Sequence, residues 1–473
     1  MAAHAAGSDS GAPALLSQTR MISVPEGTWP YRDPGRLLAP LIGVDPAEIH
    51  TVVGAVGVTQ EAVIAHLWDR IGRGELDVGL IVGGEARARA AAAKSAGVAL
   101  EEREQPEGCV PDETLSPHSL GIADLELARN IVTPSVAYAV MDQARRHLLG
   151  RTPDQQREVT GTRYAAMSQV AALRSESWDR RTYTTSEIVD VGPDNRMVAW
   201  PYTKRLCSQW NVDQSAALLM CSYATALAAG VSPERMVFPR SSAVSDHAVP
   251  VLQRPSIGES PNADAALRAA LAAAGLAASD ECSVVDLYSC FPVALDVLAS
   301  TLGRSDADGL TVTGGMSFAG GPLNNYVLGA VAALARLLRD DPNAFGLSTS
   351  VSGFLTKVGT GIWSASPPPS VVHPLDVTEQ TRAATEADEW PIDDAYVGDA
   401  EVVGWTVEHL AGAPHRVVVV LDAPTGGRTM ASSGDPEICS AMLEGEWIGV
   451  SVGVRADGSF SLGTDRGSRF GRR

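Results

Sequence analysis

The sequence predicts a soluble α/β protein that ends in a small domain of β-strands. Apolar runs of strand length, such as 78–82 and 284–288, alternate with helical patterns, and continuous runs of this kind are typical of buried parallel strands. Beyond about residue 393, short β-type runs are separated by Gly, Pro and Asp, without helical periodicity between them. Regular short strands of this kind favour a small all-β barrel of the OB type.

The first part of the α/β region follows residues 1–20, which we expect to be a flexible leader. A short strand at 51–53 and a glycine turn at 54–57 precede a helix, whose apolar residues recur at helical spacing behind the N-cap Thr59. The strand at 78–82 completes a strand–helix–strand order. This order predicts a parallel buried sheet.

The region from about 105 to 260 is longer and less regular. It contains helical runs at 123–149 and 164–176, and its last helix is expected to end at Gly230. From 261 the pattern is regular again, with an alanine-rich helix, a strand, a second helix and a glycine-rich turn. Two further strands are expected within 347–364.

The glycine-rich turn precedes a helix in the stretch TGGMSFAGGPLNNYVLGAVAAL, which spans 313–334. Gly321 and Pro322 favour a tight turn, and the absence of a Cβ lets a ligand approach the backbone closely. The following helix directs free N–H groups and its positive end at this turn. The turn can therefore hold an anion or an oxyanion, or it can serve packing alone. A related glycine turn and helix at 54–67 suggest an internal duplication.

These patterns divide the chain into five parts. They are the leader at 1–20, an N-terminal half with a loop region at 21–260, a C-terminal half at 261–365, a linker at 366–392 and the β domain at 393–473.

Composition excludes several classes of function. The 473 residues carry a net charge of −19, from 37 Lys and Arg against 56 Asp and Glu, and this charge disfavours nucleic acids and anionic membranes as partners. No run of 18 apolar residues is present, so we expect no membrane span. The six cysteines lie far apart with no secretory signal, which predicts reduced thiols in a cytoplasmic protein. The nine histidines form no i, i+4 pair, and we expect no metal site.

Three motifs carry a family resemblance that covers about 30–365. They are DVGLIVGGEA, DLYSCFP at 286–292 and GGMSFAGGPLNN at 314–325. Together they resemble the thiolase superfamily, and are similar to sterol-carrier-type thiolases and to the acetyl-CoA acetyltransferase-like, type 1 thiolase-like proteins of actinobacteria, here with an additional C-terminal domain. The resemblance implies a five-layer α/β/α/β/α core of two similar halves, whose two glycine turns face one pocket.

The sequence departs from the family at its catalytic positions. The nucleophilic Cys of a thiolase would fall near 57–58, where no Cys is present, and the His of its Gly-His-Pro motif is replaced by Gly321. The late Cys-x-Gly motif would fall at 351–353, which reads Val-Ser-Gly. We therefore do not expect ordinary thiolase chemistry through an acyl-Cys. Little more than the leader precedes TWPYRDP, so the first strand and helix of the family are expected to be missing or altered.

The same resemblance implies a set of candidate site residues. A Tyr phenol near a thioester could act as a general acid or base if its pKa were lowered from about 10. The alternative is that the tyrosines pack in the core, that the Cys is a small buried apolar residue and that the basic residues are solvated. The candidates are Tyr288, Cys290 and Tyr326 for catalysis, Gly320, Gly321, Asn324 and Asn325 for substrate or oxyanion binding, and Lys204 and Arg205 for coenzyme A.

Three functions follow from the resemblance. The first is acyltransferase-type chemistry on acyl-CoA in lipid metabolism, with coenzyme A as part of the substrate and no other cofactor. The second is retro-aldol cleavage of a 3-hydroxyacyl-CoA by tyrosines. The third is non-catalytic binding of acyl-CoA. A homodimer, or a partner protein bound through the C-terminal domain, is compatible with each of them.

Overall fold

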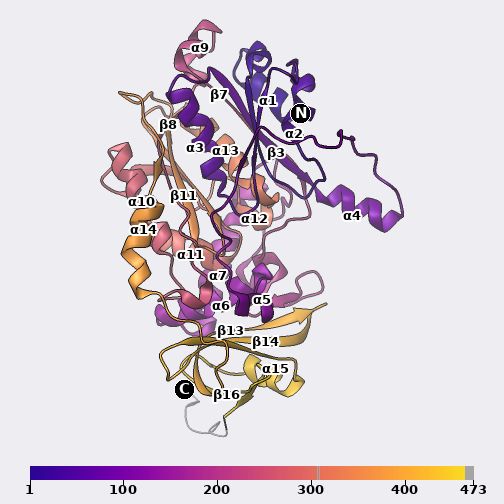
Figure 1. Cartoon of the computed structure of the whole chain (residues 1–473), viewed down its shortest axis with the longest axis vertical. Coiled ribbons are helices and arrows are strands. Elements are labelled where there is room, and N and C mark those ends of the chain that lie inside the picture. The colour runs from indigo at the N-terminus through magenta and orange to yellow at the C-terminus, as the bar shows by residue number, and fades with distance from the viewer. Residues whose placement is uncertain (306, 308, 464–473) are drawn as a thin grey trace.

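A computed structural model describes residues 1–305, 307 and 309–463 of the chain. Its core contains two five-stranded sheets that face each other across two central helices (Figure 1). The first sheet has the order β4-β2-β1-β3-β7, and all neighbouring strands are parallel except β3 and β7. Its strands are β1 Met21–Pro25, β2 His50–Gly54, β3 Val78–Ala86, β4 Glu113–Leu115 and β7 Asp213–Cys221.

The second sheet has the order β12-β8-β11-β10-β9. Strand β11 is antiparallel to both of its neighbours, whereas β9 is parallel to β10 and β12 is parallel to β8. The strands are β8 Phe238–Ser245, β9 Cys282–Asp286, β10 Phe345–Ser352, β11 Lys357–Ser364 and β12 Leu375–Asp376. The strands predicted at 51–53, 78–82, 284–288 and 347–364 are confirmed in β2, β3, β9 and the β10–β11 pair.

Two helices fill the space between the sheets. Helix α3 (Gln60–Gly72) and helix α13 (Tyr326–Asp340) each contact strands of both sheets. Thr59 caps α3 by accepting a hydrogen bond from the N–H of Ala62, as its sequence predicted. Ile64 and Leu67 are completely buried. The regularly spaced apolar residues of α3 therefore lie in the layer between the two sheets.

Outer helices cover the remaining faces of the sheets. Helices α1 (Ala2–Asp9) and α2 (Pro34–Leu38) pack against the first sheet, and α10 (Pro261–Ala274) packs against the second. Along β3, Leu80 and Val82 join the cluster beneath α1 and α2, whereas Ile81 joins the main core beside α3. Because both faces are covered, the strands are continuously apolar, and the layers follow the thiolase-like α/β/α/β/α order.

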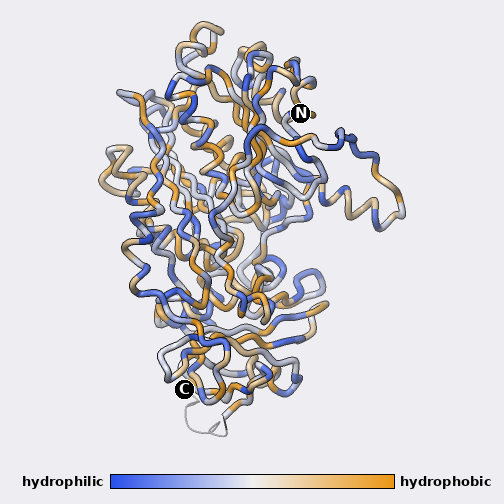
Figure 2. The backbone as a smooth tube through the Cα atoms, in the orientation of Figure 1, coloured by the Kyte–Doolittle hydropathy of each residue, from blue (hydrophilic) through white to orange (hydrophobic). Residues whose placement is uncertain are grey.

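A long insertion separates β3 from β7 and carries the C-terminal domain. Helix α6 packs on two strands of this domain, β13 (Gly398–Leu410) and β14 (Ala413–Asp422), and β5 pairs with β13. Arg146 forms an ion pair with Glu446 at 2.6 Å. Figure 1 shows the domain beneath the insertion helices, and Figure 2 shows a hydrophilic segment beside the projecting helix α4. The insertion contains α4 Arg87–Ala96, α5 Asp124–Ala128, α6 Pro134–Leu148, α7 Pro153–Ala172, α8 Thr185–Val189, β5 Met197–Ala199 and β6 Tyr202–Thr203.

The C-terminal domain is rich in strands, with the order β15-β14-β13-β16-β17. The N–H of Ser432 in β15 donates to the carbonyl of Gly458, in the turn between β16 and β17, so the two ends of the sheet approach each other. This arrangement is compatible with an OB-like barrel, and the described residues of the domain also include helix α15, so it is not built of strands alone. Its elements are β13 Gly398–Leu410, β14 Ala413–Asp422, β15 Arg428–Ser433, α15 Pro436–Leu443, β16 Ser451–Val454 and β17 Phe460–Leu462.

Residues 1–20 do not form the flexible leader that the sequence suggested. They form α1 and a 3₁₀ helix at Pro13–Gln18, and Leu15 and Leu16 of that helix are buried. Small polar residues and the lack of a strong helical period concealed this packing. The side chains that α1 and the 3₁₀ helix bury lie against the first sheet.

The boundary between the halves also differs from the prediction. Strand β8 pairs with β11, so the second half begins by residue 238 and not at 261. The helix predicted to end at Gly230 is confirmed in the short helix α9 (Tyr223–Ala228), and the residues before it form strand β7. A short apolar run fits either structure, and pairing with β3 decides for the strand. Gly230 does have the left-handed φ of +79° that ends a helix.

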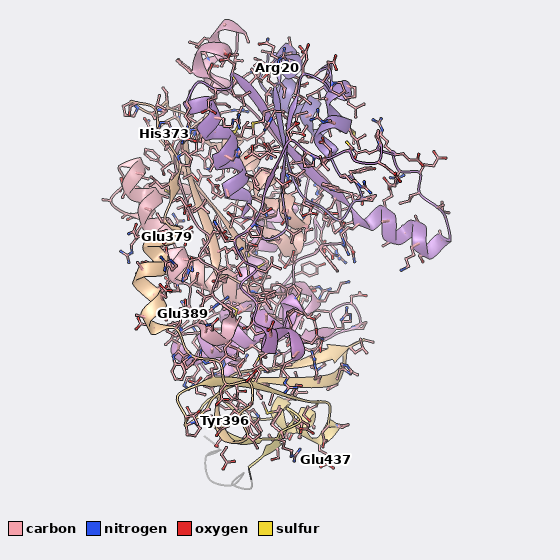
Figure 3. The ribbon with its side chains drawn as sticks, viewed as in Figure 1. Arg20, His373, Glu379, Glu389, Tyr396 and Glu437 are labelled. Carbon is pink, nitrogen blue, oxygen red and sulfur yellow. The ribbon has the colours of Figure 1, made fainter. Side chains whose placement is uncertain are left out.

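The predicted linker at 366–392 packs along the core. It contains β12 and helix α14 (Thr378–Thr385), and the N–H of Trp390 donates to the carbonyl of Gln253. Figure 3 shows His373, Glu379, Glu389 and Tyr396 in that order along one side, from the α/β core to the C-terminal domain. The last part of the predicted β domain, 464–473, lies outside the described residues. Within the part of the chain that is described, no helix is long and apolar enough to cross a membrane.

Glu61 is a buried carboxyl group in the first turn of α3. It is 1% exposed, and Ser242 donates a hydrogen bond of 2.6 Å to its Oε1. Its Oε2 has no hydrogen-bond partner among the described residues. Burial raises the pKa of Glu61 from 4.5 to about 7. The folded state therefore binds a proton more tightly at Glu61 than the unfolded state does.

We predict that Glu61→Gln increases stability above pH 7. In the native protein this carboxyl makes the free energy of unfolding fall as pH rises from 4.5 to about 7, and the loss amounts to roughly 3 kcal/mol above that range. The amide keeps an acceptor for Ser242 and removes the charge. Urea unfolding at pH 4.5 and pH 8 tests this, with the exposed Glu48→Gln as control. An equal loss of stability at both pH values in Glu61→Gln would contradict it.

Candidate functional site

The loop after β9 brings together three of the predicted site residues. Tyr288 and Cys290 follow β9 directly, and Tyr326 begins α13. The rings of Tyr288 and Tyr326 meet edge to face, with centroids 5.9 Å apart. The exposed fractions of Tyr288, Cys290 and Tyr326 are 8%, 8% and 4%. The cluster is therefore a buried one.

Asp286, which the sequence analysis did not single out, organises this cluster. Its Oδ1 accepts a hydrogen bond of 2.8 Å from the hydroxyl of Tyr326. Its Oδ2 accepts from the hydroxyl of Thr311 and from the N–H groups of Val312 and Thr313. Burial raises the pKa of Asp286, while these hydrogen bonds oppose the shift. A charged residue at the end of an apolar strand was the signal that could have identified it.

Tyr326 acts as a hydrogen-bond donor in this network. Burial raises the pKa of Tyr326 well above its ordinary value, and the neighbouring carboxyl of Asp286 raises it further. The hydroxyl of Thr313 lies 2.8 Å from the phenol oxygen. The phenol thus stays protonated at neutral pH and ties the first residue of α13 to the end of β9.

The thiol of Cys290 and the phenol of Tyr288 are held in their neutral forms. Burial raises the pKa of Cys290 to about 12, with an opposing hydrogen bond from Tyr138. Burial also raises the pKa of Tyr288 above its ordinary range, against a smaller effect of Gln60. Because a thiolate is the reactive form of Cys, Cys290 is not an activated nucleophile in this environment.

The glycine-rich loop packs closely against residues 208–214. The N–H of Gly321 donates to the carbonyl of Gln209 at 2.8 Å, so it is already engaged and is not a free oxyanion donor. A Cβ at Gly321 would lie 2.0 Å from Ser208 Oγ, so a larger side chain at this position would require Ser208 to move. Gly320 has a left-handed φ of +112°, and a Cβ there would lie 2.1 Å from Gln214 Oε1.

Asn324 and the backbone of Val327 link the start of α13 to other segments, whereas Asn325 is buried. Asn324 donates through Nδ2 to the carbonyl of Glu26 at 2.9 Å. Asn325 is 4% exposed, and its Oδ1 lacks a hydrogen-bond partner in the described part of the chain. The N–H of Val327 donates to Gln60 Oε1 at 2.7 Å, which links the first turns of α13 and α3.

A buried lysine occupies the other glycine turn. Lys357 is fully buried, and its ammonium group donates to the carbonyls of Gly57 and Ser119 and pairs with Asp246 at 3.0 Å. These three acceptors match its three N–H donors. The ammonium therefore fastens the turn before α3, where the thiolase resemblance places the nucleophilic Cys. A single Lys in an apolar strand was the only sequence signal for it.

Lys204 and Arg205 lie in the insertion, in a 3₁₀ helix at Lys204–Leu206. Lys204 is exposed. The guanidinium of Arg205 donates to the carbonyl of Glu187 and lies 4.4 Å above the ring of Tyr183. Arg205 thus has a role in packing the insertion.

A cavity of about 970 Å³ reaches part of the predicted site. Gly320, Asn325 and Tyr326 lie on its wall, together with residues of β7, α1 and α13. Tyr288 and Cys290 are not on this wall. The predicted site residues are therefore divided between a closed cluster and the end of an open cavity.

We predict that Gly321→Ala destabilises the protein by about 1–3 kcal/mol, because its methyl group collides with Ser208 Oγ. Ser208→Ala removes that oxygen and leaves the methyl group 3.4 Å from the Cβ of residue 208, so the double variant should regain most of the loss. Urea unfolding of the two single variants and the double variant gives the coupling. If the changes in the free energy of unfolding of the two single variants simply add in the double variant, the predicted contact between these residues is wrong.

Comparison with known proteins shows which folds and domains this chain resembles. Residues 382–459 match the thiolase-like protein type 1 additional C-terminal domain. The crystal structure of a monomeric SCP2-thiolase-like protein type 1 (STLP1) from Mycobacterium smegmatis is 27% identical, with a TM-score of 0.82, over 98% of this chain and 93% of that chain. No curated protein sequence matches this chain.

Thiolases without close sequence similarity share the core. The dimeric peroxisomal thiolase of Saccharomyces cerevisiae is 14% identical, with a TM-score of 0.53, over 76% of this chain and 90% of that chain. Human mitochondrial 3-ketoacyl-CoA thiolase is 14% identical, with a TM-score of 0.55, over 77% of this chain and 91% of that chain. The chain therefore has a thiolase-like fold, and its residues 382–459 match the additional C-terminal domain of the type 1 proteins.

Proposed function

We propose that this protein binds acyl-CoA thioesters in the cytoplasm and does not form an acyl-enzyme on Cys290. The thiolase-like core supports the ligand class, since a similar solved structure is named for 3-ketoacyl-CoA. The environment of Cys290 supports the absence of an acyl-enzyme, because burial raises the pKa of its thiol to about 12. The six free cysteines support a reducing compartment.

Acyltransferase chemistry of the ordinary thiolase kind needs a thiolate and a base beside it. In this protein Gly321 stands where the resemblance expects the activating His, and a larger side chain there would collide with Ser208 in its present conformation. The glycine turn before α3, where the resemblance places the nucleophile, carries no Cys and is held by the ammonium group of Lys357. These contacts favour non-covalent binding.

Two measurements test the proposal on the intact protein. Incubation with acetyl-CoA followed by intact-mass analysis should give no acyl adduct, and Cys290→Ala should bind the ligand as the native protein does. Calorimetric titration with acetyl-CoA should give a saturable heat. An acetyl group on Cys290 would refute the non-covalent part, and the absence of heat at millimolar acetyl-CoA would refute the ligand class.

Retro-aldol cleavage of a 3-hydroxyacyl-CoA is a second candidate, favoured by the edge-to-face contact of Tyr288 and Tyr326. In such a reaction one group takes the proton of the 3-hydroxyl while the bond between C2 and C3 breaks, and another group protonates the enolate that is left. The raised pKa values of both phenols suit the second of these steps, the donation of a proton.

We predict that Tyr288→Phe abolishes any release of aldehyde or ketone from a 3-hydroxyacyl-CoA and leaves the fold intact. Tyr326→Phe is a less clean test, because it also removes the hydrogen bond to Asp286 and should destabilise the protein by about 1–3 kcal/mol. Carbonyl release is followed with a coupled reductase, with Tyr223→Phe, an exposed tyrosine, as control. Unchanged turnover in Tyr288→Phe would exclude the lyase candidate.

A further inference from the structure

Three consecutive residues in the turn between β10 and β11 have a left-handed backbone. The φ angles of Gly353, Phe354 and Leu355 are +58°, +52° and +67°. Glycine adopts this region freely, but a Cβ makes it costly, so the surrounding structure must hold Phe354 and Leu355 in place. The turn begins at the last of positions 351–353, to which the resemblance assigns the late Cys-x-Gly motif.

The carbonyl groups of these three residues all accept hydrogen bonds from side chains of the segment 254–260. The guanidinium group of Arg254 donates to the carbonyl of Phe354 at 2.7 Å and to that of Gly353 at 3.3 Å. Ser260 Oγ donates to the carbonyl of Leu355 at 2.7 Å. Because Arg254 is buried, its two bonds are costly to break, and its position determines that of the turn.

The turn packs on the buried cluster of the candidate site. The ring of Phe354 meets the ring of Tyr138 edge to face, with centroids 6.1 Å apart. Tyr138 also stacks on Phe291, with centroids 4.8 Å apart, and its hydroxyl forms a hydrogen bond with Cys290. Leu355 is fully buried in the same hydrophobic cluster. The turn therefore limits the position of the Tyr138 ring and, through it, the surroundings of the thiol.

The C-terminal domain reaches Arg254 through a buried arginine of its own. Arg428 is the first residue of β15, and its guanidinium group donates to the carbonyl of Arg254. Asp422 of β14 pairs with Nε of Arg428 at 2.6 Å, and the guanidinium carbon lies 4.7 Å from the centre of the Trp390 ring. Two guanidinium groups in series thus connect β15 with the turn.

We propose that the C-terminal domain holds the turn at 353–355 against Tyr138 and so keeps Cys290 closed off from solvent. Arg428 and Arg254 are the positioning residues. Both act through backbone carbonyls, Arg428 through that of Arg254 and Arg254 through those of the turn. The inference rests on the proposed function, since it explains why Cys290 takes no acyl group.

Both connections depend on the fork of a guanidinium group. In Arg254, Nε donates to the carbonyl of Val249 at 3.1 Å while the two terminal nitrogens bind the turn. In Arg428, Nε pairs with Asp422 while a terminal nitrogen donates to the core. A lysine ammonium is a single point charge and cannot span two such partners. Arg428→Lys therefore breaks the connection and retains the positive charge.

Alkylation of the full chain with iodoacetamide tests the proposal without acetyl-CoA. Peptide mass spectrometry gives the rate of modification of each cysteine separately. In Arg428→Lys we expect Cys290 to react about tenfold faster than in the native protein, because release of the turn admits water and reagent to the thiol. The amide of Thr356, which donates to the carbonyl of Gly353 at 3.2 Å, should exchange its hydrogen faster as well.

Arg416→Lys is a matched control on the neighbouring strand. Arg416 of β14 pairs with Glu408 at 2.7 Å within the domain, and it also donates to core carbonyls, those of Arg129 and Asn130. It therefore connects the domain with the core at a place other than the turn. This variant should leave the alkylation of Cys290 unchanged. Circular dichroism and the midpoint of thermal unfolding report whether each variant is folded.

If Arg428→Lys does not fold, hydrogen exchange of the native protein in increasing urea decides. The amide of Thr356 and the amides of β15 should then lose protection in the same opening step, because the domain holds the turn. Exchange of Thr356 at clearly lower urea than β15 would show that the turn opens independently of the domain and would refute the proposal.

Three results of the alkylation would also overturn it. The first is an unchanged rate at Cys290 in Arg428→Lys. The second is an equal rise at Cys282 of β9 and Cys439 of α15, two buried thiols that report general loosening of the core and of the domain. The third is an equal rise at Cys290 in Arg416→Lys. A failure of acetyl-CoA to bind would refute the ligand class alone, since alkylation does not involve that ligand.

Discussion

The buried carboxyl group of Asp286 holds the centre of this molecule together. One of its oxygens fixes Tyr326 at the start of α13, and the other accepts hydrogen bonds from the segment 311–313 that leads into the glycine-rich loop. In a buried setting, each of these bonds is costly to leave unmade. The end of β9, the loop and the central helix are therefore fixed relative to one another by a single side chain.

This constraint also determines the chemistry of the site. The loop packs against Ser208 and Gln209, and Cys290 and Tyr288 are buried beneath it with raised pKa values. At the glycine turn before α3, the ammonium group of Lys357 binds three acceptors and holds the backbone in place. Both turns that thiolases use for covalent catalysis are thus occupied by structural contacts in this protein. A thiolase-like core that binds a thioester without attacking it is consistent with these contacts.

The sequence predicts the central layer and several strands of the fold, because their signals are local. Thr59 and the apolar spacing behind it identify α3, and the apolar run at 78–82 identifies β3. Strand β7 was not predicted, since a short apolar run fits a helix or a strand and only its pairing with β3 decides between them. The place of β8 in the second sheet likewise depends on its pairing with β11, which is distant in the sequence.

Within the site, the motifs located Tyr288, Cys290 and Tyr326, while the partners Asp286 and Lys357 depend on tertiary contacts that no local pattern encodes. The central claim is that Cys290 carries no thiolate at neutral pH. The most direct measurement is the difference in thiolate absorbance at 240 nm between the native protein and Cys290→Ala, followed from pH 6 to pH 10. We expect no titration of Cys290 in this range, because burial raises the pKa of its thiol to about 12. A midpoint below about 8.5, the value of an ordinary thiol, would contradict it.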